Sequence, residues 1–277
     1  MSQASMSGRA PATGETLVPE SAATRAWIGF TTTVRKEVVR IVRIWSQTLL
    51  PPVITTTLYF IIFGPVLGAR IGNMGGYSYL QYVTPGLIMM AVLTNAYTNV
   101  VSSFFGAKFQ RHVEEMLVSP MPNWAILLGY SMGGVFRGLV IGVLVAVVSL
   151  LFAHLPVVHP LVTLTMAALT ATAFSLAGFI NGLAAKTFDD VAIFPTFVLT
   201  PLTMLGGVFY SVHLLPDVWR TVSLVNPILY MVNGFRYGIL GVSDIPIGVA
   251  YSVLGAFVVG FWWIALVMLR RGAGLRP

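Results

Sequence analysis

Cysteine is absent from the sequence, and charged residues are scarce. Zero cysteines exclude disulfides, iron–sulfur clusters and thiol chemistry, and they say nothing about the compartment. Asp, Glu, Lys and Arg make up 9% of the 277 residues, against about 25% in an ordinary soluble domain. With 56% hydrophobic residues and a mean hydropathy of +0.84, the composition argues against a soluble enzyme and equally against a disordered chain. It predicts one membrane domain of about six spans.

Acidic and histidine side chains are missing from the hydrophobic stretches, and this limits the chemistry of the protein. All nine acidic residues, Glu37 among them, fall outside the predicted spans, so coupling to a proton or sodium ion is not expected. No HExxH pattern occurs and no histidine is embedded to activate a serine, so we expect neither a metal site nor an intramembrane protease. A P-loop is also missing, since Lys36, Lys108 and Lys186 do not follow glycine. Any ATP-driven work therefore needs a second polypeptide.

Six hydrophobic segments set the predicted fold. A helical span needs about 20 apolar residues; five segments reach that length, and the first is shorter but adequate. The predicted spans are residues 53–67, 83–105, 127–152, 161–183, 191–210 and 248–269. We therefore expect an all-α integral membrane protein with six transmembrane helices.

The basic residues predict the orientation of these spans. Twelve of the sixteen lie on one side of the predicted membrane: Arg9, Arg25, Arg35, Lys36, Arg40, Arg43, Lys108, Arg111, Lys186, Arg270, Arg271 and Arg276. Positive charge marks cytoplasmic loops, so both termini and the loops 106–124 and 184–190 are predicted to be cytoplasmic. The net charge of +7 is thus a label of orientation and does not indicate nucleic-acid binding.

The N-terminal region divides into a tail and an amphipathic helix. Residues 1–24 are rich in small and polar residues without an apolar run, which predicts a disordered cytoplasmic tail. Apolar residues then recur at intervals of three and four: Trp27, Phe30, Val34, Val38, Ile41 and Trp45. With Lys36, Arg40 and Arg43 on the opposite face, this predicts an interfacial helix whose cationic side faces water and anionic lipid, ended by Pro51 and Pro52. The alternative is a soluble helix that packs on a partner.

Several blocks of sequence resemble one known family. They are residues 102–111 (SSFFGAKFQR), 114–120 (EEMLVSP), 186–190 (KTFDD), 199–210 (LTPLTMLGGVFY), 226–231 (NPILYM) and 234–238 (GFRYG). The sequence from about residue 25 onward resembles the permease subunits of ABC-2 type ATP-binding cassette transporters, most closely their bacterial YadH-like subset. The resemblance implies a permease domain over residues 25–277, a homodimer or pseudo-dimer, and two cytoplasmic ATPase subunits that bind ATP and Mg²⁺. It implies export across the bacterial cytoplasmic membrane with no cofactor in this chain.

The second cytoplasmic loop carries the predicted contact with the ATPase. A short amphipathic helix parallel to the membrane is indicated by Phe109, Gln110, Arg111, Val113, Glu114, Glu115, Met116 and Leu117. The resemblance implies that this is the coupling helix, which docks into a groove of the nucleotide-binding subunit; the alternative is an interfacial helix without a partner. Asp189 and Asp190 form either a second contact or a solvated turn.

Polar residues within the spans are candidates for a transport path. The polar candidates are Asn95, Thr98, Asn99, Ser102 and Arg137, and the aromatic Phe104 is a further candidate on the same spans. Polar residues in a span line a path or hold helices together, and Arg137 belongs at the membrane rim or a cleft entrance. Glycines at intervals of four in the third segment predict close helix packing, more naturally within one subunit.

The stretch between residues 210 and 246 is too apolar for an ordinary extracytoplasmic loop. It predicts two short helices around Asn226 and Pro227, forming a re-entrant hairpin or an amphipathic hairpin flat on the outer leaflet. The resemblance implies that this element narrows the exit, with Trp219, Asn226, Pro227, Tyr230 and Arg236 as its candidate residues.

We therefore expect a non-enzymatic permease subunit that exports a hydrophobic, amphipathic or glycan-type substrate. The rivals are an ATP-independent channel or membrane scaffold, and an intramembrane enzyme with an embedded nucleophile.

Overall fold

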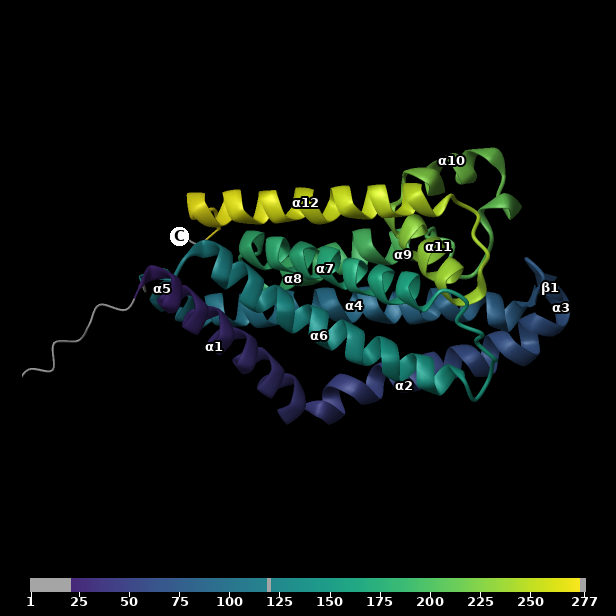
Figure 1. Ribbon diagram of the computed structural model, residues 1–277, viewed down its shortest axis with the longest axis horizontal. Helices are drawn as coiled ribbons and strands as arrows, with labels where there is room; N and C mark the ends of the chain where they lie inside the picture. Colours follow the sequence, from purple (N-terminus) through teal and green to yellow (C-terminus); the bar gives the residue numbers. More distant parts are fainter. Residues whose placement is uncertain (1–20, 119–120, 275–277) are drawn as a thin grey trace, which may run out of the picture.

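Four long helices run along the length of the molecule, and each is long and apolar enough to cross a membrane (Figure 1). They are α4 (Tyr79–Phe109), α6 (Asn123–Ser149), α7 (Pro160–Ala184) and α12 (Ile247–Arg271). The computed structural model describes residues 21–118 and 121–274. Within these ranges the only strands are the antiparallel pair β1 (Asn73–Met74) and β2 (Tyr77–Ser78). The predicted helical fold is confirmed there, and the four long helices coincide with predicted spans two, three, four and six.

The first and fifth predicted spans are broken into shorter helical pieces. The first corresponds to α2 (Trp45–Ile62), which continues through a π-helical turn (Phe63–Gly68) into α3 (Ala69–Ile71). The fifth corresponds to α8 (Phe188–Phe194), a second π-helical turn (Pro195–Leu199) and α9 (Thr200–Met204). Neither segment is among the four that could cross a bilayer by length and composition. The count of six spans therefore remains a prediction.

The two prolines predicted to end the N-terminal helix lie inside the next one. The break between α1 (Ala22–Arg43) and α2 falls at Ile44, whose φ of −107° and ψ of 35° leave the helical region. Pro51 and Pro52 are then the seventh and eighth residues of α2. The predicted boundary was wrong because the chain turns before it reaches the prolines.

Helix α4 is the centre of the bundle and packs against α6, α7 and α11 (Pro227–Leu240). It begins with a capping box, in which Ser78 and Gln81 each accept a hydrogen bond from the other's backbone N–H. Its C-terminal half carries Phe104, which is fully buried between the rings of Tyr130 and Phe179. This aromatic cluster fixes α4, α6 and α7 relative to one another.

Glycines on α6 let two neighbouring helices approach closely. A Cβ atom placed on Gly138 would lie 3.0 Å from the carbonyl oxygen of Val92 on α4, and one on Gly133 would lie 2.6 Å from the Cβ of Glu37 on α1. The second distance is shorter than real Cβ contacts, and the first is tighter than most of them. The glycine ridge therefore packs within one subunit, as the sequence favoured.

Helix α1 packs along α6 with a face that the sequence pattern did not predict. The two helices run in the same direction, since Thr33 lies against Gly129 and Glu37 against Gly133. The buried residues of α1 are Ala26, Thr33, Glu37 and Ile41, whereas Trp27 is 63% exposed. Of the predicted apolar face, Ile41 alone is buried, because the glycine ridge accepts small side chains and leaves no room for aromatic rings.

The two ends of the molecule differ in character. Helix α5 (His112–Val118) and the end of α12 lie at one end, while β1 and α10 (Asp217–Val225) lie at the other (Figure 1). The two short helices predicted around Asn226 and Pro227 are confirmed as α10 and α11. Helix α11 is largely buried in the bundle, whereas α10 is mostly exposed. Their depth in the membrane remains a prediction.

Candidate functional site

A cavity of about 260 Å³ lies between α2, α4 and α6. Helix α2 contributes most of its wall, α4 contributes a second side, and α6 contributes a single residue, Arg137. The polar or partly polar lining residues are Gln47, Thr48, Thr55, Thr56, Tyr59, Thr94, Asn95 and Arg137. Of the predicted path residues, the cavity brings together Asn95 and Arg137.

Arg137 lies near the middle of α6 and faces this cavity. At 1.5 Å per residue, its position is about 21 Å from Asn123 and about 18 Å from Ser149. Helix α6 thus begins well before Arg137, and the side chain lines the cavity, while its depth in the membrane remains a prediction. One guanidinium nitrogen donates to Asn95 Oδ1 at 3.5 Å. The Asn95 amide is itself oriented by donation from Nδ2 to the carbonyl of Ala91 at 2.9 Å.

A second polar cluster lies beside the cavity, toward the end of the molecule that carries α5. The Glu37 carboxylate is completely buried, with Arg40 at 2.7 Å. The Ser103 hydroxyl donates to Glu37 Oε1. The amide of Asn99 joins both, since its Oδ1 accepts from Arg40 at 2.9 Å and its Nδ2 donates to Glu37 at 3.5 Å. This cluster ties α1 to α4.

The position of Glu37 corrects the expectation that every acidic group stays clear of the spans. Glu37 belongs to α1, yet its carboxylate contacts Asn99 and Gly133, which lie about 15 Å from the end of α4 at Phe109 and the start of α6 at Asn123. Glu37 is thus held inside the bundle, as is much of Arg40, which the sequence pattern placed on the water-facing side of α1. The carboxylate is paired with Arg40 there.

The remaining predicted path residues point elsewhere. Phe104 is enclosed by the aromatic cluster, and Asn99 belongs to the Glu37 cluster. Thr98 and Ser102 are exposed on α4, and the Ser102 hydroxyl donates back to the carbonyl of Thr98 at 2.7 Å. The polar stripe of α4 therefore divides among the cavity, a buried ion pair and an open surface.

The predicted coupling helix is shorter than the sequence suggested and follows a sharp turn. Gln110 ends α4 and Arg111 adopts a left-handed conformation with φ of 62°, so α5 begins only at His112. Val113 is buried, Met116 packs against the same core, and Met116 Sδ lies 3.9 Å from the Tyr130 hydroxyl. Arg111 and Glu115 are exposed. The side chains of Glu114 and Leu117 lie outside the described part of the structure.

Phe109 is the last residue of α4 and is not part of α5, so it does not share the buried face of Val113 and Met116. It is 64% exposed, and its ring lies 5.0 Å from that of Phe188 at the start of α8. Phe188 also contacts Phe105 edge-on. This contact joins the segment between α4 and α5 to the segment that carries Asp189 and Asp190.

Asp190 has a structural task in that loop. Its carboxylate accepts from the backbone N–H groups of Lys186 and Thr187, each at 2.9 Å, and Thr187 Oγ1 accepts from the Asp190 N–H in return. These two donors hold the pKa of the Asp190 carboxyl below its usual range. Asp190 therefore caps α8, while Asp189 is exposed and remains the candidate for a second contact.

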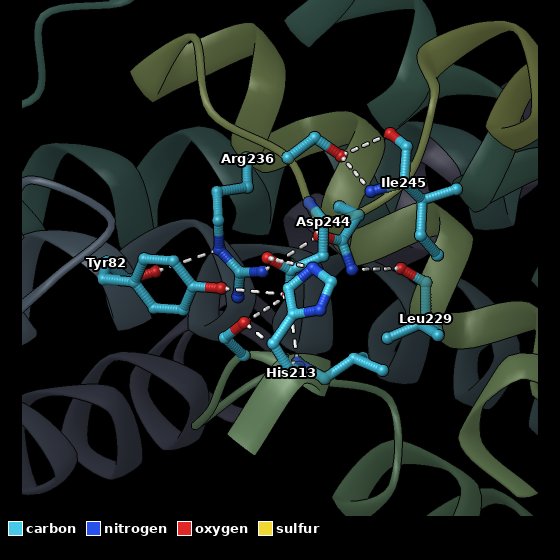
Figure 2. A network of polar contacts seen from close by, with 10 residues as sticks. Tyr82, His213, Leu229, Arg236, Asp244 and Ile245 are labelled. Atoms are coloured by element: carbon cyan, nitrogen blue, oxygen red, sulfur yellow. Dashed lines mark hydrogen bonds and ion pairs between the residues drawn. The ribbon is translucent and has the colours of Figure 1, made fainter. Parts of the chain in front are cut away.

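At the other end of the molecule, Arg236 is completely buried rather than turned toward an exit (Figure 2). It donates to the carbonyl oxygens of Gly207 at 2.7 Å and Tyr82 at 3.2 Å, and its guanidinium lies 4.0 Å from the Tyr82 ring. Asp244 accepts from the Tyr82 hydroxyl at 3.4 Å and lies 4.0 Å from His213 Nε2. The network joins α4, α11 and the loop before α12.

The other predicted exit residues hold α10 and α11 in place or face outward. Asn226 caps α11 by accepting from the Ile228 N–H at 3.0 Å, and Pro227 is the first residue of that helix. The Tyr230 hydroxyl donates to the carbonyl of Leu224 at 2.7 Å. Trp219 is 52% exposed on α10. Among residues 21–118 and 121–274, no group of His, Asp and Glu side chains could hold a metal ion.

Sequence reasoning missed the α2 wall of the cavity and the burial of Glu37. The α2 wall carries a readable signal, because Thr48, Pro52, Thr55 and Tyr59 recur at intervals of three and four and share one helical face. No comparable signal marks Glu37, whose partners Asn99 and Ser103 are 62 and 66 residues away in the chain.

Comparison with known proteins relates the sequence of this chain to a family of transporters. Residues 29–240 match the family described as "ABC-2 type transporter". The chain is 56% identical over 250 residues to the "Inner membrane transport permease YadH" of Escherichia coli (strain K12), an alignment that covers 90% of this chain and 98% of that protein. "Nodulation protein J" of Rhizobium leguminosarum bv. trifolii is 26% identical over 215 residues, which are 77% of this chain and 82% of that protein. These matches over most of the sequence show that the chain belongs to the ABC-2 type transporter family.

Proposed function

We propose that this chain is the permease subunit of an ATP-driven exporter in the bacterial cytoplasmic membrane. It works as a homodimer with two copies of a separate cytoplasmic ATPase, and both of its termini are cytoplasmic. The substrate is a hydrophobic, amphipathic or glycan-type molecule. Membership of the ABC-2 family supports this proposal, as does the printed description of a 56% identical relative as an inner membrane transport permease.

One row of contacts along α6 carries the proposal. The short helix α5 contacts Tyr130 through Met116, Gly133 lies one turn further along α6 against Glu37, and Arg137 lies one turn beyond that in the cavity. A force applied to α5 thus acts first on the cytoplasmic end of α6 and then on the cavity wall. Closure of two ATPase subunits would draw the two α5 helices together and move this row.

The side chains of α5 suit a docking role. Val113 and Met116 anchor the helix on the bundle, while Arg111, His112 and Glu115 are exposed at the end of the molecule. Separate energy supply also agrees with the sequence, which lacks a P-loop. The competing function, an ATP-independent channel or scaffold, requires no partner at this surface.

The test reverses charge on α5 and measures its association with the ATPase. In Glu114→Lys with Glu115→Lys, we expect the ATPase subunit that co-purifies with the wild-type permease to be lost, and permease-dependent ATPase activity in proteoliposomes to fall with it. Asp217→Lys is the control, because it reverses a charge on α10 at the opposite end of the molecule. Undiminished ATPase binding by the α5 variant would place the contact elsewhere, and a wild-type permease that retains no ATPase would favour the channel or scaffold.

A further inference from the structure

Two of the residues that line the cavity carry buried polar atoms without a partner. Arg137 Nε and Thr48 Oγ1 are both inaccessible to solvent, and neither forms a hydrogen bond within the described parts of the chain. Arg40 Nε, in the neighbouring cluster, is also buried without a hydrogen-bond partner in the described parts of the chain. Unpaired polar atoms of this kind are costly in a protein interior. Five further such atoms belong to described residues that do not line the cavity, but Arg137 and Thr48 lie in its wall, where a bound hydrogen-bond acceptor would satisfy them.

The charge around the cavity is also out of balance. Arg137 in the cavity wall and Arg40 in the neighbouring cluster carry two positive charges, and Glu37, the partner of Arg40, carries one negative charge, which leaves a net charge of +1. Glu37 is already bound by Arg40 and Ser103. None of the described residues that line the cavity is acidic, and the charge that acts on Arg137 is the like charge of Arg40. Water could supply hydrogen bonds here, but it could not supply the missing negative charge.

The shape of the lining separates a polar end from an apolar side. The guanidinium of Arg137 has five N–H groups in a planar fork, which suits the oxygens of a phosphate or carboxylate, and the Thr48 hydroxyl is a further donor. Leu87, Met90 and Ala91 of α4 form an apolar side of the same cavity. An anionic head with a hydrocarbon attached would satisfy both parts.

We propose that this cavity binds the anionic phosphate-type or carboxylate-type group of an amphipathic molecule, with Arg137 as the charge partner and Thr48 as a second donor. Binding itself does not depend on the proposed function. The assignment of this molecule to the exported substrate does rest on it, and narrows the substrate to an anionic amphipath.

The test measures binding of simple probes to the purified permease in dodecyl maltoside. Decyl phosphate should raise the melting temperature of the wild type, whereas inorganic phosphate, decyl maltoside and decyltrimethylammonium should not. Arg137→Gln should weaken the binding of decyl phosphate by about tenfold or more, and Arg137→Lys should retain part of it. Arg220→Gln, which removes an exposed arginine of α10, should bind as the wild type does.

A second variant keeps the test decisive if Arg137→Gln does not fold. Valine has the shape of threonine without the hydroxyl, and the Thr48 hydroxyl has no partner in the described structure. We therefore expect Thr48→Val to fold normally and to bind decyl phosphate about threefold more weakly. Equal binding of decyl phosphate by wild type, Arg137→Gln and Thr48→Val would overturn the proposal. If decyl maltoside raised the melting temperature as much as decyl phosphate does, the proposal would be overturned too, because the site would then not select for a negative charge.

A further measurement separates a transported amphipath from a resident lipid. Native mass spectrometry of the purified permease should show no anionic phospholipid that depends on Arg137. If phosphatidylglycerol is retained by the wild type and lost from Arg137→Gln, the cavity is a lipid site and the substrate assignment is overturned. If the permease binds decyl phosphate but no ATPase, the binding proposal stands and the proposed exporter fails.

Discussion

Arg40 and Glu37 form an ion pair inside the helical bundle, with 2.7 Å between a guanidinium nitrogen and a carboxylate oxygen. The carboxylate side of the pair is fully buried, whereas the Arg40 side chain keeps 30% of its exposure. The two partners are therefore not equivalent. Arg40 can turn toward solvent if Glu37 is replaced, but the buried Glu37 carboxylate cannot reach solvent if Arg40 is replaced.

Removal of Arg40 should accordingly cost more than neutralisation of Glu37. Arg40→Leu leaves a buried carboxylate without its counter-ion, and we expect a loss of about 3 kcal/mol in the free energy of unfolding. Glu37→Gln keeps polar partners for Asn99 and Ser103 and should cost about 1 kcal/mol. Thermal unfolding of the detergent-solubilised protein measures both. As a control, Lys36→Leu on the exposed side of α1 should stay within about 0.5 kcal/mol of wild type. If Lys36→Leu lost as much stability as Arg40→Leu, the loss could not be assigned to the ion pair.

Gly133→Ala should weaken the attachment of α1 to α6. The new Cβ would lie 2.6 Å from Glu37 Cβ, so α1 must move outward and loosen the ion pair. We expect a destabilisation of about 1–3 kcal/mol and faster proteolysis of α1. The matched control is Gly255→Ala on α12, where an added Cβ meets nothing within 4 Å. Equal effects of the two substitutions would contradict the close contact.

Arg236→Lys should destabilise the protein although it keeps the charge. A lysine ammonium cannot serve the carbonyls of Gly207 and Tyr82 in the planar geometry of the guanidinium, and it stacks less well on the Tyr82 ring. We expect a loss of about 3 kcal/mol, measured by thermal unfolding. Arg220→Lys, on the exposed surface of α10, is the control. A neutral outcome for Arg236→Lys would mean that the network in Figure 2 is not required for stability.

Acid should release the cap of α8. The pKa of the Asp190 carboxyl is lowered from its ordinary value of 3.8 by the Lys186 and Thr187 N–H groups, so its stabilisation is present above the unfolded pKa and is lost as the pH falls through the lower folded pKa. The protection factors for hydrogen exchange at the start of α8 should therefore be high above about pH 4 and fall below it. Asp190→Asn should remove this dependence, while Asp189→Asn should retain it. An unchanged profile in Asp190→Asn would assign the protection to another group.

The long helices could be predicted from apolar length, but the broken ones could not. Helices α4, α6, α7 and α12 are continuous apolar runs, which leave little choice of structure in a membrane. The segment containing α8 and α9 is comparably apolar, but Pro195 and Pro201 interrupt its hydrogen bonding and a π-helical turn forms between them. Apolar length alone does not register such breaks.

The candidate site was predictable one residue at a time and not as an arrangement. Asn95 and Arg137 stand out because polar residues are rare in spans, yet their contact across 42 residues depends on how α4 crosses α6. The face that α1 buries was mispredicted for a related reason. The hydrophobic pattern of α1 indicates which side avoids water, while the glycines of α6 determine which side fits a groove. Only the second of these depends on a partner helix that lies a hundred residues away.

The burial of Glu37 also imposes an order on biosynthesis. Its partners Asn99 and Ser103 are made 62 and 66 residues later, and Gly133 emerges from the ribosome later still. Until then α1 has no groove that can receive a carboxylate, and its charges must stay hydrated. The buried ion pair can therefore form only after α4 and α6 have been made and have packed against α1.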